Sequence, residues 1–291
     1  MNVLITGANG QLGSELKRLS EKEPELNFCF TDIEELDITS VEALKNFLDG
    51  NPQDYILNCA AYTAVDQAET DEEGAYELNL KAVQGITREC LERNIQLIHF
   101  STDFVFDGSL RRPITEKDKP NPQSVYGRSK YAGEQYIHGL QTGITIRTSW
   151  LYSSFGKNFV KTIIRLGRER DIIKVVNDQT GSPTYAADLA RAAILTIKKT
   201  GKPEKPPLHK LFHYANEGVC SWFDLASLVI EYTGIDCRIE PVGTKDYPTA
   251  AQRPMYSVLD VTRIKQWLGI EIPHWTESLR ICCDELMGKG Y

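Results

Sequence analysis

The sequence has no excess of positive charge and no long hydrophobic run. Its 33 lysines and arginines are outnumbered by 40 aspartates and glutamates, which gives a net charge of −7 at pH 7. Proteins whose main partner is nucleic acid usually carry a basic surface, so nucleic-acid binding is not expected. No apolar stretch approaches the ~20 residues that a helix needs to cross a bilayer. A membrane-spanning segment is therefore not expected either.

Metal-ligand patterns and a secretion signal are also missing. The five histidines and seven cysteines show no metal-binding spacing, and Cys282 and Cys283 are adjacent without a matching pattern elsewhere. An odd number of cysteines indicates reduced thiols, and the first residues carry no basic region typical of a signal peptide. The sequence therefore predicts a cytoplasmic protein. His99 lies inside an apolar run and is predicted to be a core residue rather than a catalyst.

The chain does contain a regular alternation of strand-like apolar runs and amphipathic helical segments. Its 291 residues, 41% hydrophobic and 25% charged, suffice for one large or two medium domains. We predict an α/β protein with a Rossmann-type, doubly wound parallel sheet covered by helices on both faces. Predicted strands are 2–6, 26–31, 55–60, 96–101 and 143–149, with short ones near 172–178 and 211–216; predicted helices are 14–22, 40–48, 73–94 and 129–140.

The alternation breaks down after about residue 150. Gly, Pro and aromatic residues are scattered there among short helices, and the polar stretch 198–207 indicates an exposed loop. We expect residues 1–149 to form a dinucleotide-binding domain, completed by segments within about 170–216. Residues 150–291 are expected to form mainly a smaller substrate-binding lobe, interleaved with the first domain and closing over the carboxyl edge of the sheet.

A glycine-rich loop joins the first predicted strand to the first predicted helix. Gly7, Gly10 and Gly13 stand between them, which is the context that a dinucleotide-binding loop requires. Glycines there permit a tight turn and a close approach of backbone to a pyrophosphate, which then lies on the N–H groups of the new helix. The spacing Gly-x-x-Gly-x-x-Gly differs from the Gly-x-Gly-x-x-Gly of most dehydrogenases.

Asp32 ends the second predicted strand. An acidic side chain there can accept hydrogen bonds from the adenosine ribose, which favours NADH over NADPH. Arg18 or Lys17 on the first helix can still meet a 2′-phosphate, and Asp32 can instead simply begin the following loop. Asp37 in that loop can contact the adenine edge or form a helix-capping turn.

Tyr126 and Lys130 are four residues apart, so they project from one face of a helix. A nearby ammonium can lower the pKa of a phenol and make it a usable proton carrier near neutral pH. Such a pair is weak evidence of function on its own. Its meaning comes from the glycine-rich loop at the start of the same chain and from Thr102 at the end of the fourth predicted strand.

Several segments match the motifs of one superfamily, in order along nearly the whole chain. They are Gly7-x-x-Gly10-x-x-Gly13, residues 58–66, 101–108, 147–150, 178–184 and 253–257, and Tyr126-x-x-x-Lys130. Together they resemble the extended short-chain dehydrogenase/reductases. More narrowly, the segments that begin at Thr102, Arg147, Asp178 and Arg253 resemble the dTDP-4-dehydrorhamnose reductase family.

The resemblance implies that NADPH or NADH reduces the C4 keto group of dTDP-4-dehydro-6-deoxy-L-mannose (dTDP-4-dehydrorhamnose), giving dTDP-L-rhamnose. It also implies the catalytic residues. Tyr126 would donate the proton, and Lys130 would hold the nicotinamide ribose and stabilise the tyrosinate. Thr102 would bond the carbonyl oxygen. Neighbours on a strand face opposite ways, so only one of Ser101 and Thr102 can point into the site, and the resemblance selects Thr102.

The resemblance also implies two sets of binding residues. Trp150 can lie against a deoxysugar methyl group or a thymine, or can be a core residue between lobes. Arg253 can bind the diphosphate or form a surface salt bridge, and Gln179 can touch substrate or only hold its loop. The implied cofactor-binding residues are Gly7, Gly10, Gln11, Leu12, Gly13, Asp32, Asp37, Ile38, Ala60, Ala61, Tyr62, Thr63, Tyr126 and Lys130; the implied substrate-binding residues are Thr63, Val65, Thr102, Asp103, Tyr126, Trp150, Gln179 and Arg253.

An acidic group that binds magnesium between two subunits in some relatives has a counterpart here. Glu15, Asp188 and Glu285 fall at matching places, but one of the three differs in type from the usual glutamate. We therefore predict no metal ligand and leave both Mg²⁺ and the choice between monomer and homodimer open.

Two other functions stay open at this point. A nucleotide-sugar epimerase or dehydratase of the same superfamily uses the same Tyr and Lys with a bound NAD that is recycled. A non-catalytic regulatory subunit, resembling that of methionine adenosyltransferase, works by binding its partner. The intact Thr102, Tyr126 and Lys130 weigh against the purely binding role.

Overall fold

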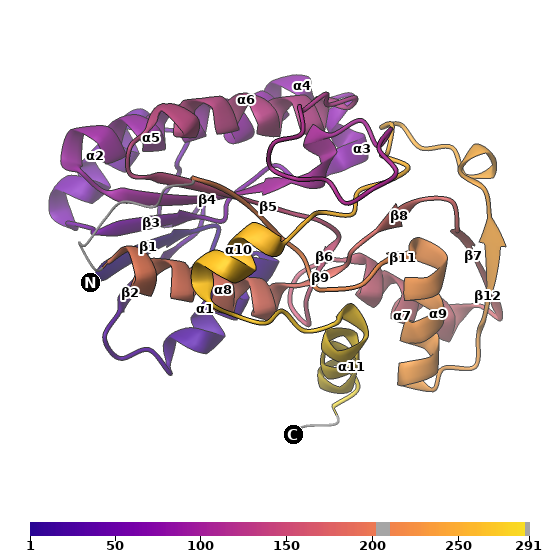
Figure 1. Cartoon of the computed structure of the whole chain (residues 1–291). Helices are drawn as coiled ribbons and strands as arrows, with labels where there is room; N and C mark the ends of the chain where they lie inside the picture. Colours follow the sequence, from indigo (N-terminus) through magenta and orange to yellow (C-terminus); the bar gives the residue numbers. More distant parts are fainter. Residues whose placement is uncertain (202–209, 289–291) are drawn as a thin grey trace.

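The computed structural model describes residues 1–201 and 210–288, and its centre is a six-stranded parallel sheet (Figure 1). The strand order is β10-β5-β4-β3-β1-β2, and every neighbouring pair is parallel. The chain winds outward in one direction from β1 to β2 and in the other through β3, β4 and β5. The doubly wound parallel sheet is thus confirmed. The strands are β1 (Asn2–Thr6), β2 (Asn27–Thr31), β3 (Tyr55–Asn58), β4 (Gln96–Thr102), β5 (Gly143–Thr148) and β10 (Leu211–Tyr214).

Helices cover both faces of this sheet. In Figure 1, α2, α5 and α6 lie above the sheet and α1, α8 and α10 below it. The short elements α3, α4, η1 and η2 follow strands β3 and β4 and lie near the start of α6. The bounds are α1 (Gln11–Ser20), α2 (Val41–Gly50), α3 (Val65–Ala68), α4 (Glu72–Tyr76), η1 (Glu77–Lys81), α5 (Ala82–Arg93), η2 (Asp103–Val105), α6 (Val125–Gly139), α8 (Ala186–Thr200) and α10 (Thr262–Leu268).

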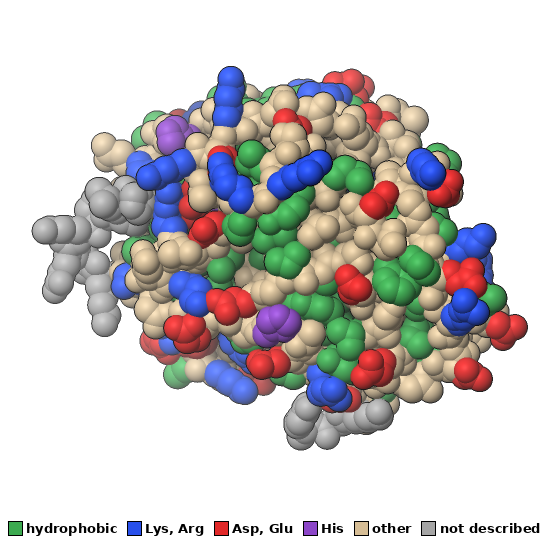
Figure 2. Space-filling view, turned by 45° about the vertical axis from the view of Figure 1, so that its right-hand side comes forward, with side chains coloured by type: hydrophobic (Ala, Val, Ile, Leu, Met, Phe, Trp, Pro, Cys, Tyr) green, Lys and Arg blue, Asp and Glu red, His purple; other side chains and the backbone are tan. Residues whose placement is uncertain are grey.

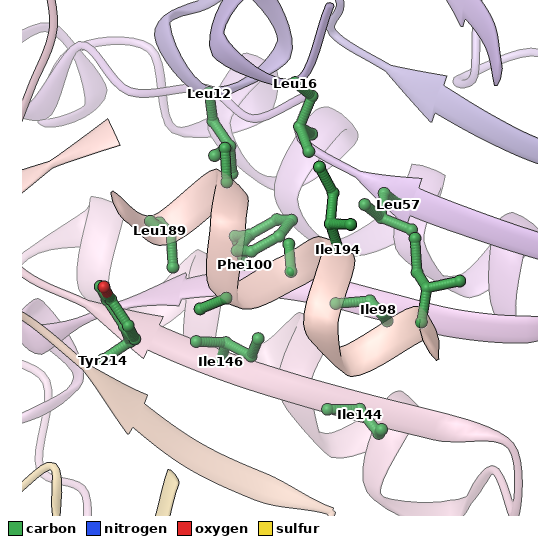
Figure 3. Packing of buried hydrophobic residues seen from close by; sticks show 14 of the residues in the cluster. Leu12, Leu16, Leu57, Ile98, Phe100, Ile144, Ile146, Leu189, Ile194 and Tyr214 are labelled. Atoms are coloured by element: carbon green, nitrogen blue, oxygen red, sulfur yellow. The ribbon is translucent and has the colours of Figure 1, made fainter. Parts of the chain in front are cut away.

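Large apolar side chains fill the space between the sheet and the α1–α8 layer (Figure 3). Leu16 from α1 and Ile194 from α8 are buried against Ile98 and Phe100 of β4 in one cluster. Burying one such side chain contributes about 1.5–3 kcal/mol. Successive residues of a strand point to opposite faces, so the residue between these two, His99, points toward α6 instead.

Two of the differences from the predicted helix boundaries have a clear structural cause. Helix α6 begins at Val125 rather than at residue 129, because the Ser124 hydroxyl caps it by accepting a 3.1 Å hydrogen bond from the Gly127 N–H. The predicted helix 73–94 is interrupted by η1, a π-helical turn that separates α4 from α5. A π turn shifts the phase of the helical repeat, and therefore a search for a 3.6-residue period does not detect it.

The remaining elements form a second cluster next to the end of the sheet where β1 leads into α1 (Figure 1). Its core contains Tyr152, Val160, Val229 and Leu279. The division into two domains at about residue 150 stays a prediction. Most of the predicted loop 198–207 lies outside the described residues. The elements are β6 (Leu151–Tyr152), α7 (Phe159–Glu169), β7 (Ile172–Val176), β8 (Thr180–Gly181), β9 (Thr184–Tyr185), β11 (Cys220–Ser221), α9 (Trp222–Thr233), β12 (Arg238–Val242), η3 (Thr244–Asp246) and α11 (Trp275–Leu286).

The surface carries both signs of charge. Figure 2 shows Lys and Arg side chains and Asp and Glu side chains spread over one face, with hydrophobic areas between them. Among the described residues, no helix combines the length and the apolar composition that crossing a membrane requires.

Candidate active site

The glycine-rich turn between β1 and α1 leaves no room for a side chain at Gly7 or Gly13. Gly7 has φ +65°, and a Cβ there would lie 2.6 Å from the backbone nitrogen of Ala60. A Cβ on Gly13 would lie 2.4 Å from the carbonyl oxygen of Gly7. Helix α1 begins after Gly10 with no side-chain cap and no acidic residue in its first turn. Its first N–H groups are therefore available to an anion, and the loop fits a dinucleotide pyrophosphate.

The two acidic residues after β2 make local turns. Asp32 accepts hydrogen bonds from the backbone N–H groups of Asn9 at 2.8 Å and Ile33 at 2.9 Å, so it ties the glycine-rich loop to the end of β2. Asp37 accepts from both the N–H and the hydroxyl of Thr39, at 2.9 and 2.6 Å. The cap of α2 is Ser40 rather than Asp37. Nucleotide contacts of Asp32 and Asp37 stay predictions.

The other predicted cofactor-binding residues fall into two groups. The side chains of Leu12 and Ile38 are buried in the core, so only their backbone atoms can face a nucleotide. The Gln11 side chain accepts a 3.0 Å hydrogen bond from Asn158. Ala60, Ala61, Tyr62 and Thr63 form the loop that follows β3, beside Gly7.

Asn79 fixes that loop and was missed by sequence reasoning. It lies on the π turn η1, is buried, and accepts from the Tyr62 N–H at 3.0 Å. Its amide nitrogen donates to the Tyr62 carbonyl at 3.1 Å and to the Ser129 hydroxyl at 3.0 Å. π turns are frequent at functional sites. The sequence feature that could have identified Asn79 is an amide side chain inside an otherwise helical, partly apolar segment.

Tyr126 and Thr102 lie together at the carboxyl end of β4. Tyr126, on α6, is only 9% exposed; the Thr102 side chain is close enough to lower its pKa, and the Phe104 ring packs edge-on against it at 5.5 Å. The Thr102 hydroxyl donates to Asp103 at 3.1 Å and accepts from the Phe104 N–H at 3.2 Å. Two of the three predicted catalytic side chains therefore lie near each other.

The expected lowering of the Tyr126 pKa by Lys130 is wrong for this structure. Burial raises the pKa of Tyr126 to about 12, and Asp103 adds to the rise, against the hydrogen bond with Thr102. Desolvation of the phenolate outweighs the helical neighbour, whose ammonium is engaged elsewhere. A phenol that stays protonated at neutral pH is the form that proton donation requires.

Lys130 is buried beneath α6. Its Nζ donates to the carbonyl oxygen of Phe100 at 2.7 Å and lies 3.3 Å from Nε2 of His99. Burial lowers the pKa of Lys130 to about 8, opposed mainly by the charge of Glu134. His99 is fully buried, as predicted for a core residue, but it also contacts a predicted catalytic residue.

Asp103 offers an unused acceptor. Burial raises the pKa of this carboxyl to about 6, against the nearby Ser257 and Thr102 side chains, which lower it. Its Oδ2 is buried and has no hydrogen-bond partner among the residues described. Such an atom suits a substrate hydroxyl, because a hydrogen bond from the ligand would satisfy it.

Ser101, which precedes Thr102 on β4, is the cross-strand neighbour of Arg147 on β5.

The remaining predicted substrate residues make contacts within the chain. Trp150 has a left-handed backbone, φ 48°, and stacks on Trp222 with ring centroids 3.7 Å apart. Gln179 donates to the Thr244 hydroxyl at 3.0 Å, and Arg253 forms a two-pronged ion pair with Asp66 at 3.0 and 2.6 Å. For each of these three residues, a contact within the chain therefore supports the structural alternative to substrate binding. Thr63 is exposed and Val65 begins α3; substrate binding by these residues stays a prediction.

A cation of the chain already lies between two of the three acidic residues considered for magnesium. Arg18 pairs with Glu15 at 2.6 Å and with Glu285 at 2.7 Å, so its guanidinium already has two carboxylate partners. Asp188 accepts from Asn216 at 2.8 Å and pairs with Arg191 at 2.9 Å. Over residues 1–201 and 210–288, no group of three or more His, Cys, Asp or Glu is arranged to hold a metal ion. The magnesium question stays open.

Three features together define the extended short-chain dehydrogenase/reductases. They are a doubly wound parallel sheet, a glycine loop that leads into an uncapped helix, and a Tyr and a Lys on the buried face of one helix beside a Thr at the end of a strand. Comparison of the sequence with known protein families narrows this class. The chain belongs to the family described as the RmlD substrate binding domain, which matches residues 1–287.

Individual relatives agree over almost their full length. A dTDP-4-dehydrorhamnose reductase of Aggregatibacter actinomycetemcomitans is 38% identical over 287 residues, covering 96% of this chain and 97% of the relative. The solved dTDP-4-dehydrorhamnose reductase of Clostridium acetobutylicum has a TM-score of 0.92 at 39% identity, covering 98% and 99% of the two chains. That of Bacillus anthracis, solved in complex with NADP, has a TM-score of 0.92 at 38% identity and the same coverage. A UDP-galactose 4-epimerase at 20% identity shares the fold alone.

Proposed function

We propose that this protein is an NAD(P)H-dependent reductase that converts the C4 keto group of dTDP-4-dehydrorhamnose into the hydroxyl of dTDP-L-rhamnose, the final step of dTDP-rhamnose biosynthesis. The observation that carries the proposal is the buried, protonated Tyr126 beside Thr102, in a chain of the RmlD family. A proton donor next to a hydrogen-bonding hydroxyl is what reduction of a carbonyl oxygen needs.

The chain's own residues supply every requirement except the hydride, which a bound reduced nicotinamide delivers to C4. Gly7, Gly10 and Gly13 would admit the pyrophosphate, and Lys130 would bond the ribose. Tyr126 would transfer its phenolic proton to the sugar oxygen, and Lys130 would stabilise the tyrosinate left behind. Thr102 would donate a hydrogen bond to that same oxygen, turning from Asp103 to do so.

Cofactor oxidation measured against sugar product tests this function. With the dTDP-4-keto-deoxysugar and NADH or NADPH, we expect cofactor to be oxidised in proportion to the sugar reduced. Product formed without net cofactor oxidation would replace the reductase by an epimerase, which recycles its NAD. No turnover, together with tight binding to another protein, would favour the regulatory-subunit role.

Arg253 is proposed to bind the sugar-nucleotide diphosphate, with Asp66 holding its guanidinium in place. Arg253→Ala is expected to raise KM for the sugar nucleotide by about 10–100-fold, since it removes charged hydrogen bonds, with a smaller effect on kcat. Asp66→Asn is the matched control, because it weakens the ion pair but keeps the cation. Steady-state kinetics would contradict the proposal if both variants changed KM equally.

The remaining properties follow from this function. We expect both NADH and NADPH to serve, since Asp32 favours NADH while the Bacillus anthracis relative holds NADP. None of the seven cysteines, all of which lie among the described residues, forms a disulfide, which suits the reducing cytoplasm where we expect the reaction. We expect a monomer or a homodimer, with no nucleic acid or membrane as partner.

A further inference from the structure

A row of buried polar side chains crosses the sheet beneath α6 and ends at Lys130. Thr6 on β1, Asn58 on β3 and His99 on β4 are cross-strand neighbours. The Thr6 hydroxyl is 2.8 Å from Asn58 Oδ1, Asn58 Nδ2 is 3.2 Å from His99 Nδ1, and His99 Nε2 is 3.3 Å from Lys130 Nζ. None of the four is more than 2% exposed. The row connects the residue before Gly7 with the proposed catalytic lysine.

Burying four polar groups is costly unless each finds a partner. The Asn58 amide and both His99 ring nitrogens make their side-chain hydrogen bonds within the row. Lys130 Nζ carries three hydrogen-bond directions as an ammonium. Phe100 O takes one and His99 takes another, so the direction left is the one available to a ligand. His99 therefore contributes to fixing where that last N–H points.

The row fits either protonation state of Lys130 once the Asn58 amide turns by 180°, which exchanges the places of its oxygen and its NH₂ group. His99 is neutral, because burial and the charge of Lys130 hold its pKa well below the ordinary value, so it has one N–H and one acceptor nitrogen. Beside an ammonium, Nε2 accepts, Nδ1 carries the proton, and Asn58 presents its oxygen. Beside a neutral amine, Nε2 donates and Nδ1 accepts from the Asn58 NH₂ group. The two ends of an amide have nearly the same shape, so both patterns fit the same positions.

We propose that His99 is a positioning residue for Lys130, holding Nζ in place through the Thr6–Asn58–His99 row and following the gain or loss of its proton by changing tautomer. The proposal rests on the proposed function, because Lys130 acts in the same proton-transfer site. Besides His99, the ionisable groups that face Lys130 are Glu134 on α6 and Cys59 after β3. Only His99 both contacts Nζ and continues into a hydrogen-bonded row.

Two substitutions separate positioning from filling space. Gln in place of His99 puts a polar atom near the position of Nε2, which meets Lys130, whereas Asn puts one near Nδ1, which meets Asn58. His99→Asn is expected to lower kcat by about 10–100-fold, as for a lost hydrogen bond to a charged group. His99→Gln is expected to keep kcat within about threefold of wild type, well inside that range. KM for the sugar nucleotide is expected to change little in either.

His213 is the matched control, since it is equally buried on β10 and its Nδ1 is 3.0 Å from the Ile114 carbonyl oxygen. His213→Asn and His213→Gln are expected to leave kcat unchanged. Equal losses in His99→Asn and His99→Gln, or no loss in either, would overturn the proposal. Failure of the wild type and the His213 variants to reduce the keto sugar would instead reject the proposed function.

Nuclear magnetic resonance of the cofactor-free wild type tests the inference without turnover. Imidazole ¹⁵N shifts report which ring nitrogen carries the proton, and the lysine ¹³Cε shift follows Lys130. We expect the tautomer of His99 to change as Lys130 titrates, while that of His213 stays fixed. A His99 ring that keeps one tautomer throughout would overturn the proposal, even if His99→Asn failed to fold.

Discussion

Tyr126→Phe is expected to lower kcat by about 10²–10⁴-fold, the range that a positioned general acid supplies. The change removes only the hydroxyl and keeps the ring packed on Phe104, so the fold and the cofactor affinity should persist. Because the Tyr126 pKa is raised to about 12, the donor is protonated throughout the neutral range. Stopped-flow or steady-state oxidation of NADH measures the loss, and fluorescence titration measures cofactor binding.

Tyr136→Phe serves as the control, since Tyr136 lies on the same helix but is 48% exposed. It should match the wild type in kcat. Activity of Tyr126→Phe within about threefold of wild type would fall well short of a general acid's contribution and identify another proton donor. An equal loss in Tyr136→Phe would point to damage to α6 rather than to chemistry.

Glu134→Leu is expected to lower the free energy of unfolding by about 3–5 kcal/mol. Glu134 on α6 and Arg147 on β5 form a two-pronged ion pair at 2.9 and 2.6 Å, and both side chains are at most 5% exposed. Removing the carboxylate leaves a guanidinium buried without its counter-charge over the Phe106 ring. Urea unfolding, with the slope checked between variants, measures the change.

The double variant Glu134→Leu/Arg147→Met should recover most of that loss, because an apolar pair of similar volume needs no charge compensation. The exposed pair Arg165–Glu169 is the control; Glu169→Leu should cost less than about 1 kcal/mol. A double variant as unstable as Glu134→Leu would show that packing, rather than the unpaired charge, dominates.

The sheet and the glycine loop could be predicted because their signals are local. Strand β4 contains the apolar residues Leu97, Ile98 and Phe100, and Gly7 and Gly13 stand at fixed offsets from β1. Burial and cross-strand register are not local. The sequence showed Lys130 one turn from Tyr126, but not the desolvation that decides the direction of the Tyr126 pKa.

Contacts between distant segments were out of reach for the same reason. Asp66 and Arg253 are 187 positions apart, and nothing in either segment identifies the other. His99 was correctly predicted to be buried, yet its contact with Lys130 depends on which face of β4 meets α6. Asn79 depends on a π turn that departs from the helical period.

The late position of β10 in the chain has a consequence for biosynthesis. A nascent polypeptide that has left the ribosome as far as β5 carries five of the six sheet strands, but β5 pairs with Leu211–Tyr214 on its open side. Until that segment emerges, β5 presents an unsatisfied hydrogen-bonding edge, which is a template for aggregation. Helix α8, which covers one face of the sheet, is also still missing. The growing chain is therefore most exposed to chaperones between the emergence of β5 and the emergence of Leu211–Tyr214 from the ribosome.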